Sequence, residues 1–116
     1  MVHASGYYSV GTVEFLVDAR GKFYFIEVNP RVQVEHTVTE MLTGSDLVKA
    51  QLDIARGLEW DRGFESRGHA VEARVNAENT EQGFAPSPGL VKVFRAPSGP
   101  GVRVDSGIIE GMRIPA

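Results

Sequence analysis

The side chains best suited to chemistry lie in one ten-residue segment, 27–36. Six of them are polar or ionisable and follow a strongly apolar stretch: Glu27, Asn29, Arg31, Gln33, Glu35 and His36. That density is hard to explain by packing. Alternate residues of a strand share a face, so Glu27 and Asn29 are expected to point to the same side.

A β-hairpin is the element that must position these two residues. Residues 12–17 and 22–29 are rich in β-branched and aromatic side chains, and residues 18–21 have the composition of a turn. If the loop has two or four residues, Glu14 faces Phe25 and becomes the same-face diagonal neighbour of Glu27, about 7–8 Å away. An odd loop without a bulge would separate the two carboxylates.

Two carboxylates and one amide oxygen form a ligand set for a hard cation. Mg²⁺ prefers oxygen ligands and usually completes its shell with water and substrate phosphates. Glu14, Glu27 and Asn29 therefore fit a metal that holds a nucleotide. The alternative is that both carboxylates are solvated charges, with Arg20 and Lys22 as available partners.

The segment after Pro30 is expected to be an irregular loop, because proline fixes φ and removes a donor. Arg31 offers a planar fork for a small oxyanion such as a carboxylate or bicarbonate, and Gln33 and the Val34 amide can add neutral donors. Glu35 is a candidate general base, or alternatively the salt-bridge partner of Arg31. His36 is either a packed or capping residue or a proton carrier.

Two short helices are expected next, followed by a β-rich second half that joins near 57–68. Residues 37–40 have the spacing of a capping box, Gly44 can end the first helix, Ser45 can cap the second, and Gly57 can end it. Alternating patterns then predict strands at 71–75 and 91–94, and a further short strand is expected at 102–105.

Composition limits the remaining possibilities. The chain has 116 residues, 42% of them apolar, with 12 Lys+Arg, 15 Asp+Glu and no cysteine. Disulfides are excluded, no apolar run could cross a bilayer, and the scattered cations argue against a nucleic-acid partner. We expect a soluble, intracellular protein with a buried hydrophobic core. The end at Ala116 predicts a cut sequence.

Several motifs together resemble biotin carboxylase, the ATP-grasp component of biotin-dependent carboxylases. They cover nearly the whole chain: Gly11–Leu16, Glu27–His36, Thr37–Met41, Gly68–Arg74, Pro86–Gly89 and Gly101–Ser106. The resemblance implies an α+β fold. Residues 1–63 would be the C-terminal part of an ATP-grasp domain, a β-hairpin plus short helices. Residues 64–116 would be the antiparallel β start of the biotin carboxylase C-terminal domain.

The resemblance also implies a role for each site residue. Glu14, Glu27 and Asn29 would hold Mg²⁺ or Mn²⁺ on ATP, with Leu16 near the adenine. Bicarbonate would be held by Arg31, Gln33 and Val34, and Glu35 would deprotonate it for attack on the γ-phosphate, giving carboxyphosphate. Arg103 would stabilise the enolate-like oxygen of biotin during carboxyl transfer, although Asp105 on the same face is an alternative partner.

Departures from the family set the expected limits. Family members are several times longer, and their glycine-rich lid and upstream lysines have no counterpart before Glu14. We therefore expect the chain alone to bind ATP poorly, a prediction that micromolar Mg²⁺–ATP binding in a titration would contradict. Expected partners are the rest of the parent carboxylase, biotin on a carrier domain and, in some cases, a second copy. The expected location is the cytoplasm, or else the mitochondrial matrix.

Two other functions stay open at this stage. Carbamoyl-phosphate synthetases share Glu-x-Asn-Pro-Arg, but residues 33–36 favour the biotin branch. The chain could also be an inactive truncated product or a non-catalytic β-rich module. Bicarbonate-dependent ATPase activity with free biotin distinguishes these possibilities.

Overall fold

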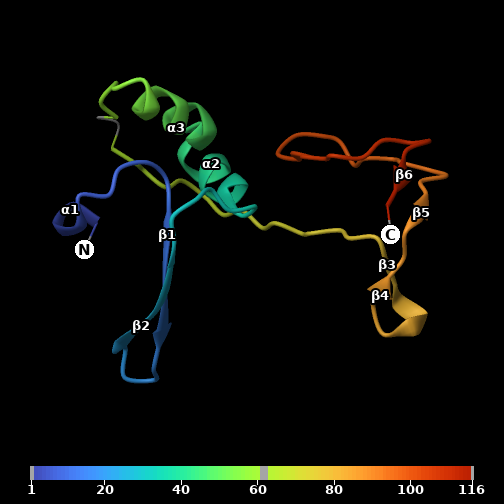
Figure 1. Ribbon diagram of the computed structural model, residues 1–116, viewed down its shortest axis with the longest axis horizontal. Helices are drawn as coiled ribbons and strands as arrows, with labels where there is room; N and C mark the ends of the chain where they lie inside the picture. The colour runs from blue at the N-terminus through green and yellow to red at the C-terminus, as the bar shows by residue number, and fades with distance from the viewer. Residues whose placement is uncertain (1, 61–62, 116) are drawn as a thin grey trace. The chain divides into compact units, whose positions relative to one another are not determined.

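The structure is a computed structural model that describes residues 2–60 and 63–115. It divides into two compact units, Met1–Ala73 and Arg74–Ala116. The first unit holds α1 (Val2–Ser5), β1 (Thr12–Val17), β2 (Phe23–Asn29), α2 (His36–Thr43) and α3 (Leu47–Ala55). The second holds β3 (Glu78–Asn79), the 3₁₀ helix η1 (Thr80–Gln82), β4 (Ala85–Pro86), β5 (Gly89–Leu90) and β6 (Arg113–Ile114). Helices and antiparallel strands together confirm the α+β prediction (Figure 1).

Strands β1 and β2 form the predicted hairpin, with a different register. The loop runs over 18–22, so its length is odd, and Val17 pairs with Phe23. A β-bulge follows, because Glu14 pairs with Glu27 while Phe15 pairs with Phe25. The bulge inserts one extra residue into β2 and restores the same-face relation that the odd loop would have lost. The two carboxylates are therefore direct cross-strand partners, and the predicted diagonal pairing is wrong.

Asp18 organises the hairpin turn. Its carboxylate accepts hydrogen bonds from the main-chain N–H groups of Arg20 (2.9 Å) and Lys22 (3.0 Å). Gly21 adopts the left-handed conformation, with φ of 76°. The bonds from Lys22 and Arg20, with a smaller contribution from Tyr24, lower the pKa of Asp18 below its ordinary value of 3.8.

The hairpin is expected to lose order in acid. Because the folded pKa of Asp18 is depressed, its stabilising effect is complete above pH 3.8 and is lost as the pH falls through the lower folded value. Amide hydrogen exchange across the turn should therefore accelerate in Asp18→Ala at neutral pH. Asp18→Asn, which keeps an acceptor, should retain protection without this acid transition. Equal protection in the alanine variant would contradict the assignment.

The start of α2 differs from the prediction. The helix begins at His36, and Glu35 occupies the N-cap position without a side-chain cap hydrogen bond. Thr37 therefore lies inside the first turn, where its hydroxyl donates to Glu72 (2.6 Å). Glu40 is buried and accepts from the main-chain N–H of Leu47 (2.5 Å). The predicted capping box is thus wrong, and both of its members contact other segments.

The ends of the helices follow glycine and Asx chemistry. Gly44 ends α2 in the left-handed conformation, as predicted. Asp46, and not Ser45, caps α3, since its side chain accepts from the main-chain N–H of Lys49 (2.7 Å). Gly57, with φ of 81°, follows the helix, and its N–H donates to the Ile54 carbonyl (2.9 Å), as expected for a glycine that ends a helix.

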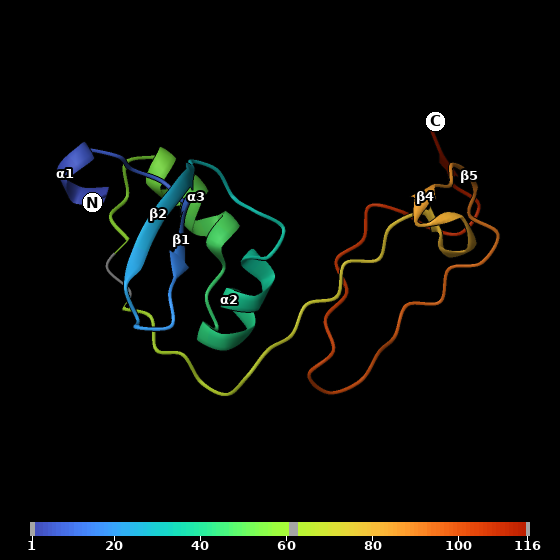
Figure 2. The ribbon, with the colours of Figure 1, turned by 90° about the horizontal axis from the view of Figure 1, so that it is seen from below.

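Helices α2 and α3 lie beside the end of the hairpin where β1 begins and β2 ends, and the turn lies farthest from them (Figures 1 and 2). Residues of the segment before β1, of α2 and of α3 line an apolar cavity of about 280 Å³, among them Gly11, Thr39, Ala50 and Ile54. The expected core is small. Among the described residues, Ala50 (2% exposed) is the only buried apolar side chain. No described helix is long and apolar enough to span a membrane.

The second unit has fewer strand residues than predicted. Its strands pair as β3 with β4 and β5 with β6. Residues 71–75, 91–94 and 102–105 are not strands, and Val71 and Val75 are 95% and 93% exposed. An alternating pattern describes a half-buried strand, but a strand exists only when another strand pairs with it. Among the described residues none pairs with 71–75. All three strand predictions, at 71–75, 91–94 and 102–105, are therefore wrong.

Candidate metal and anion site

Glu14, Glu27 and Asn29 meet on one face of the hairpin. The Asn29 side-chain amide donates to Glu14 Oε1 (2.9 Å) and to Glu27 Oε1 (3.0 Å). Glu14 and Asn29 are half-buried, and Glu27 is exposed. The three side chains therefore converge, as the strand spacing predicts.

The alternative partners of the two carboxylates lie elsewhere. Arg20 is in the hairpin turn, and the Lys22 ammonium sits 5.1 Å from the centre of the Tyr24 ring. Within the described part of the chain, neither cation forms an ion pair with Glu14 or Glu27. Two like charges directly opposite each other are destabilising, so this face favours a bound cation.

The donor set fits Mg²⁺ or Mn²⁺ held together with a phosphate ligand. Over residues 2–60 and 63–115, no three acidic, histidine or cysteine side chains gather into a metal centre. Two carboxylates and an amide oxygen leave several positions for water and phosphate, as Mg²⁺ requires. The amide NH₂ group now faces the carboxylates, which only accept. A cation between them would repel that group, so binding requires the Asn29 amide to turn and present its oxygen.

The predicted irregular loop follows directly. Strand β2 ends at Asn29, and the Arg31 N–H donates back to the Asn29 carbonyl (2.8 Å). The Arg31 guanidinium is exposed and donates to the Val32 carbonyl (3.3 Å). Among the described residues it makes no ion pair with Glu35, so the salt-bridge alternative is not seen. Glu35, at the N-cap of α2, is exposed beside the positive end of a helix.

Gln33 and His36 form the inner side of the loop. The Gln33 carbonyl accepts from the His36 main-chain N–H (3.1 Å) and lies 2.7 Å from His36 Nδ1. The side-chain oxygen of Gln33 is buried and, within the described residues, has no hydrogen-bond partner. An unpaired buried acceptor of this kind is unfavourable, so we expect a donor to reach it when the rest of the enzyme is present. Val34, the third predicted anion contact, is exposed.

Two further predicted residues lie outside this cluster. Leu16 is two residues after Glu14 in β1, so it shares the carboxylate face, and it is 65% exposed. Arg103 belongs to the second unit and binds Asp105 through two hydrogen bonds, Nε to Oδ2 (2.7 Å) and Nη2 to Oδ1 (3.0 Å). The predicted Asp105 partnership is therefore present.

Gly11 is a contact of the site that motif chemistry did not single out. A Cβ at this position would lie 3.2 Å from the Asn29 carbonyl oxygen and 3.5 Å from Pro30 Cα. The 3.5 Å contact is ordinary, but the 3.2 Å contact is tighter than most Cβ contacts and would require the Asn29 carbonyl to move by a few tenths of an ångström. Gly11 therefore permits the close approach that sets the position of Asn29 and the start of the loop.

Gly11→Ala is expected to displace Asn29. In an enzyme containing this chain, a shift of a fraction of an ångström at the metal face should reduce the rate by about 10- to 100-fold. Gly107→Ala is the matched control, because a Cβ there meets no atom within 4 Å. Steady-state rates of the two variants check the prediction, and equal rates would contradict it.

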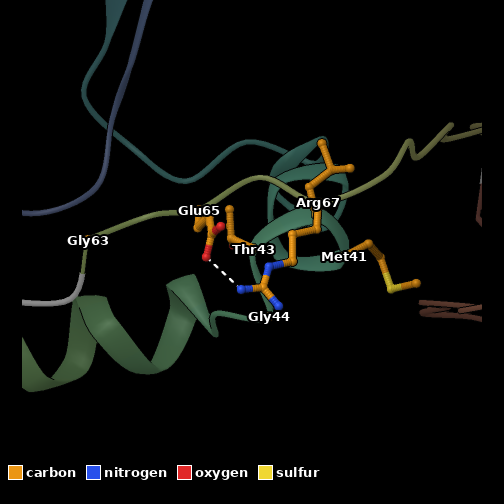
Figure 3. Close-up of a pocket in the computed structure, with 7 residues that line it drawn as sticks. Met41, Thr43, Gly44, Gly63, Glu65 and Arg67 are labelled. Atoms are coloured by element: carbon orange, nitrogen blue, oxygen red, sulfur yellow. Dashed lines mark hydrogen bonds and ion pairs between the residues drawn. The ribbon is translucent and has the colours of Figure 1, made fainter.

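The larger pocket of the first unit is separate from these residues. It has a volume of about 510 Å³ and lies at the C-terminal end of α2, lined in part by Met41, Gly63 and Arg67. The side chains of Arg67 and Glu65 point toward each other there and form an ion pair of 2.7 Å (Figure 3). This pocket contains none of the predicted site residues.

Comparison with known families and proteins finds a match for each half of the chain. Residues 1–62 match the family model described as the carbamoyl-phosphate synthase L chain, ATP binding domain. Residues 72–116 match the biotin carboxylase C-terminal domain. Biotin carboxylase 1 of Bacillus subtilis is 49% identical over 116 residues, covering 97% of this chain and 26% of that protein. The biotin carboxylase of Pseudomonas aeruginosa is 54% identical over 113 residues, covering 95% of this chain and 25% of that protein.

A solved structure shows the same similarity. The biotin carboxylase domain dimer of Hydrogenobacter thermophilus 2-oxoglutarate carboxylase was crystallised with MgADP, ADP and bicarbonate. It is 45% identical, with a TM-score of 0.92, and the match covers 97% of this chain and 26% of that chain. The present chain thus spans about a quarter of the length of the relatives it matches.

Proposed function

The chain belongs to the biotin carboxylase family, and we propose that it supplies the metal face and bicarbonate loop of a longer ATP-dependent ligase. That enzyme would carboxylate biotin. The observation that carries the proposal is the Asn29 amide within hydrogen-bond distance of both Glu14 and Glu27, directly before the loop with Arg31 and Glu35.

The metal face would bind the nucleotide. Mg²⁺ or Mn²⁺ bound by Glu14, Glu27 and Asn29 would neutralise negative charge on the phosphates of ATP. Leu16, exposed on the same face, would contact the adenine. The relative from Hydrogenobacter thermophilus, which was crystallised with MgADP and bicarbonate, supports this choice of ligands.

The loop would bind and activate bicarbonate. The Arg31 guanidinium, the Gln33 side chain and the Val34 main-chain N–H would hold the anion. Glu35 would take the bicarbonate proton, and the oxygen so freed would attack the γ-phosphorus of ATP. ADP leaves and carboxyphosphate forms. Because Glu35 is exposed and not ion-paired to Arg31 among the described residues, it is available for this proton.

Carboxyl transfer would follow from carboxyphosphate. Its breakdown gives carbon dioxide and phosphate, the phosphate would take the proton of the biotin ureido nitrogen, and that nitrogen would then attack the carbon of carbon dioxide, giving carboxybiotin. Arg103 would stabilise the enolate-like oxygen formed when the proton is lost, with Asp105 holding the guanidinium plane by two hydrogen bonds.

The remaining parts of the proposal concern context. The partners would be the rest of the carboxylase, biotin on a carrier domain and a second copy, as in the dimer of the Hydrogenobacter relative. We place the boundary between the ATP-grasp part and the C-terminal domain at 63/64, which lies between the two family matches. We also propose a cytoplasmic location, which fits the acidic, cysteine-free composition.

A chimera tests the function directly. In Bacillus subtilis biotin carboxylase 1, the matching segment is replaced by this chain, so that the missing three-quarters of the enzyme is restored. We expect ADP release that requires both bicarbonate and free biotin. A folded chimera that binds ATP but shows no bicarbonate-dependent ADP release would contradict the proposal and favour a non-catalytic module.

A further inference from the structure

The bicarbonate loop, residues 30–35, needs a support that its own sequence does not provide. Residues 30–35 contain no helix or strand, and the Arg31 guanidinium bonds only to a neighbouring carbonyl among the described contacts. Groups that bind a small anion must nevertheless be held in place before the anion arrives. His36, the first residue of α2, is the side chain in position to do this.

His36 makes a double contact with one carbonyl. Its main-chain N–H donates to the Gln33 oxygen at 3.1 Å, and its Nδ1 lies 2.7 Å from the same atom. A carbonyl oxygen only accepts, so Nδ1 must carry the hydrogen in this contact. Both the neutral Nδ1–H tautomer and the imidazolium satisfy it, so the contact does not depend on whether the ring is charged.

The first turn of α2 is itself anchored. The Thr37 hydroxyl donates to the carboxylate of Glu72, 35 residues further along the chain, at 2.6 Å. This acidic group also lies beside the positive end of the helix. The contact with Glu72 therefore holds the start of α2 in place. The hydrogen bond from the His36 ring connects the Gln33 carbonyl to this helix start.

We propose that His36 is a positioning residue of the bicarbonate loop. By binding the Gln33 carbonyl it fixes the backbone from which the Gln33 side chain and the Val34 N–H reach the anion. The inference rests on the proposed function, because it assigns a task to the loop that function requires. It also makes His36 a support and not the proton carrier.

Kinetics of the chimera test this role. His36→Ala should raise KM for bicarbonate by about 10- to 100-fold, the usual cost of losing a group that orients a binding residue, while KM for ATP stays unchanged. His36→Asn, whose amide nitrogen can take the place of Nδ1, should restore most of the affinity. His36→Gln, whose amide nitrogen corresponds to Nε2, should not. An unchanged KM for bicarbonate in the alanine variant, or equal rescue by asparagine and glutamine, would overturn the proposal.

A spectroscopic measurement separates this inference from the proposed function. In the ¹⁵N-histidine-labelled chimera, active or not, the resonances absent from His36→Ala identify the ring. We expect Nδ1 to carry a hydrogen, in the neutral Nδ1–H tautomer or in the imidazolium, and the Nε2–H tautomer with a bare Nδ1 would refute the positioning role. If a hydrogen on Nδ1 is found in a chimera without bicarbonate-dependent activity, the proposed function fails while the contact stands.

Discussion

Glu35→Gln in the chimera is expected to abolish bicarbonate-dependent ADP release. Glutamine has nearly the same shape, but it cannot accept the bicarbonate proton. Loss of a general base costs about 100- to 10,000-fold in rate. Binding of ATP should persist, since Glu35 lies outside the carboxylate pair of the hairpin. Initial rates with saturating ATP and varied bicarbonate measure the effect.

Glu59→Gln is the matched control for this substitution. Glu59 is also exposed, lies in the first unit after α3, and is not among the residues proposed for the site. It should keep the full rate. A Glu35→Gln chimera that retains more than about a tenth of the activity would show that another group takes the proton.

Glu27→Gln should have opposite effects on activity and on stability. The substitution removes a proposed metal ligand. Loss of a residue that only supports a metal ligand weakens metal binding by about 10- to 100-fold. Loss of a ligand itself should raise the activation constant for Mn²⁺ by more than that. In EDTA it also removes one of two like charges that are direct cross-strand partners. That relief should stabilise the metal-free protein by about 0.2–1 kcal/mol at low salt.

Two measurements check the pair of effects. Rates at varied Mn²⁺ give the activation constant, and thermal unfolding in EDTA gives the change in stability. Glu59→Gln should alter neither. A Glu27→Gln chimera with unchanged Mn²⁺ dependence would remove Glu27 from the metal site. A loss of stability in EDTA would instead mean that the hydrogen bond from Asn29 outweighs the repulsion.

Local sequence chemistry predicted the hairpin and the C-terminal ends of the helices, but not the helix starts or the hairpin register. The turn composition at 18–21, Gly44 and Gly57 act through their own backbone preferences, so they can be identified without tertiary information. The bulge in β2 could not be, because register depends on which face packs against the rest of the fold. The same limit applies to Thr37, whose side chain contacts Glu72, and to Glu40, whose carboxylate accepts from the first residue of α3 instead of capping its own helix.

The strand predictions of the second half failed for a related reason. Alternation at 71–75 and 91–94 reports a preference for extended backbone, whereas strand formation needs a partner of matching length. The Val91 N–H does donate to the Met112 carbonyl (2.9 Å), and the Val91 carbonyl accepts from the Gly111 N–H (2.9 Å), so the β5–β6 pairing is extended by one residue. The alternating pattern was therefore wrong about strand pairing at 71–75 and at 92–94.

The convergence of Glu14, Glu27 and Asn29 could be predicted from their residue types and spacing, whereas the contacts that surround the proposed site could not. Glu14, Glu27 and Asn29 stand out because carboxylate and amide oxygens at strand spacing are a ligand set. Gly11 and the His36 contact to Gln33 depend on how close two backbones approach, which no spacing rule reveals. Residues that would contact a ligand can be predicted from their chemistry. Residues that hold them in position depend on tertiary packing, which the sequence pattern does not reveal.

The most direct test of the metal site is a crystal structure of the chimera with Mn²⁺, ADP and bicarbonate, with data that locate manganese by anomalous scattering. We predict a manganese peak between the carboxylates of Glu14 and Glu27, with the Asn29 amide turned so that its oxygen faces the ion. Manganese located elsewhere, with the Asn29 NH₂ group still bridging the two carboxylates, would contradict it.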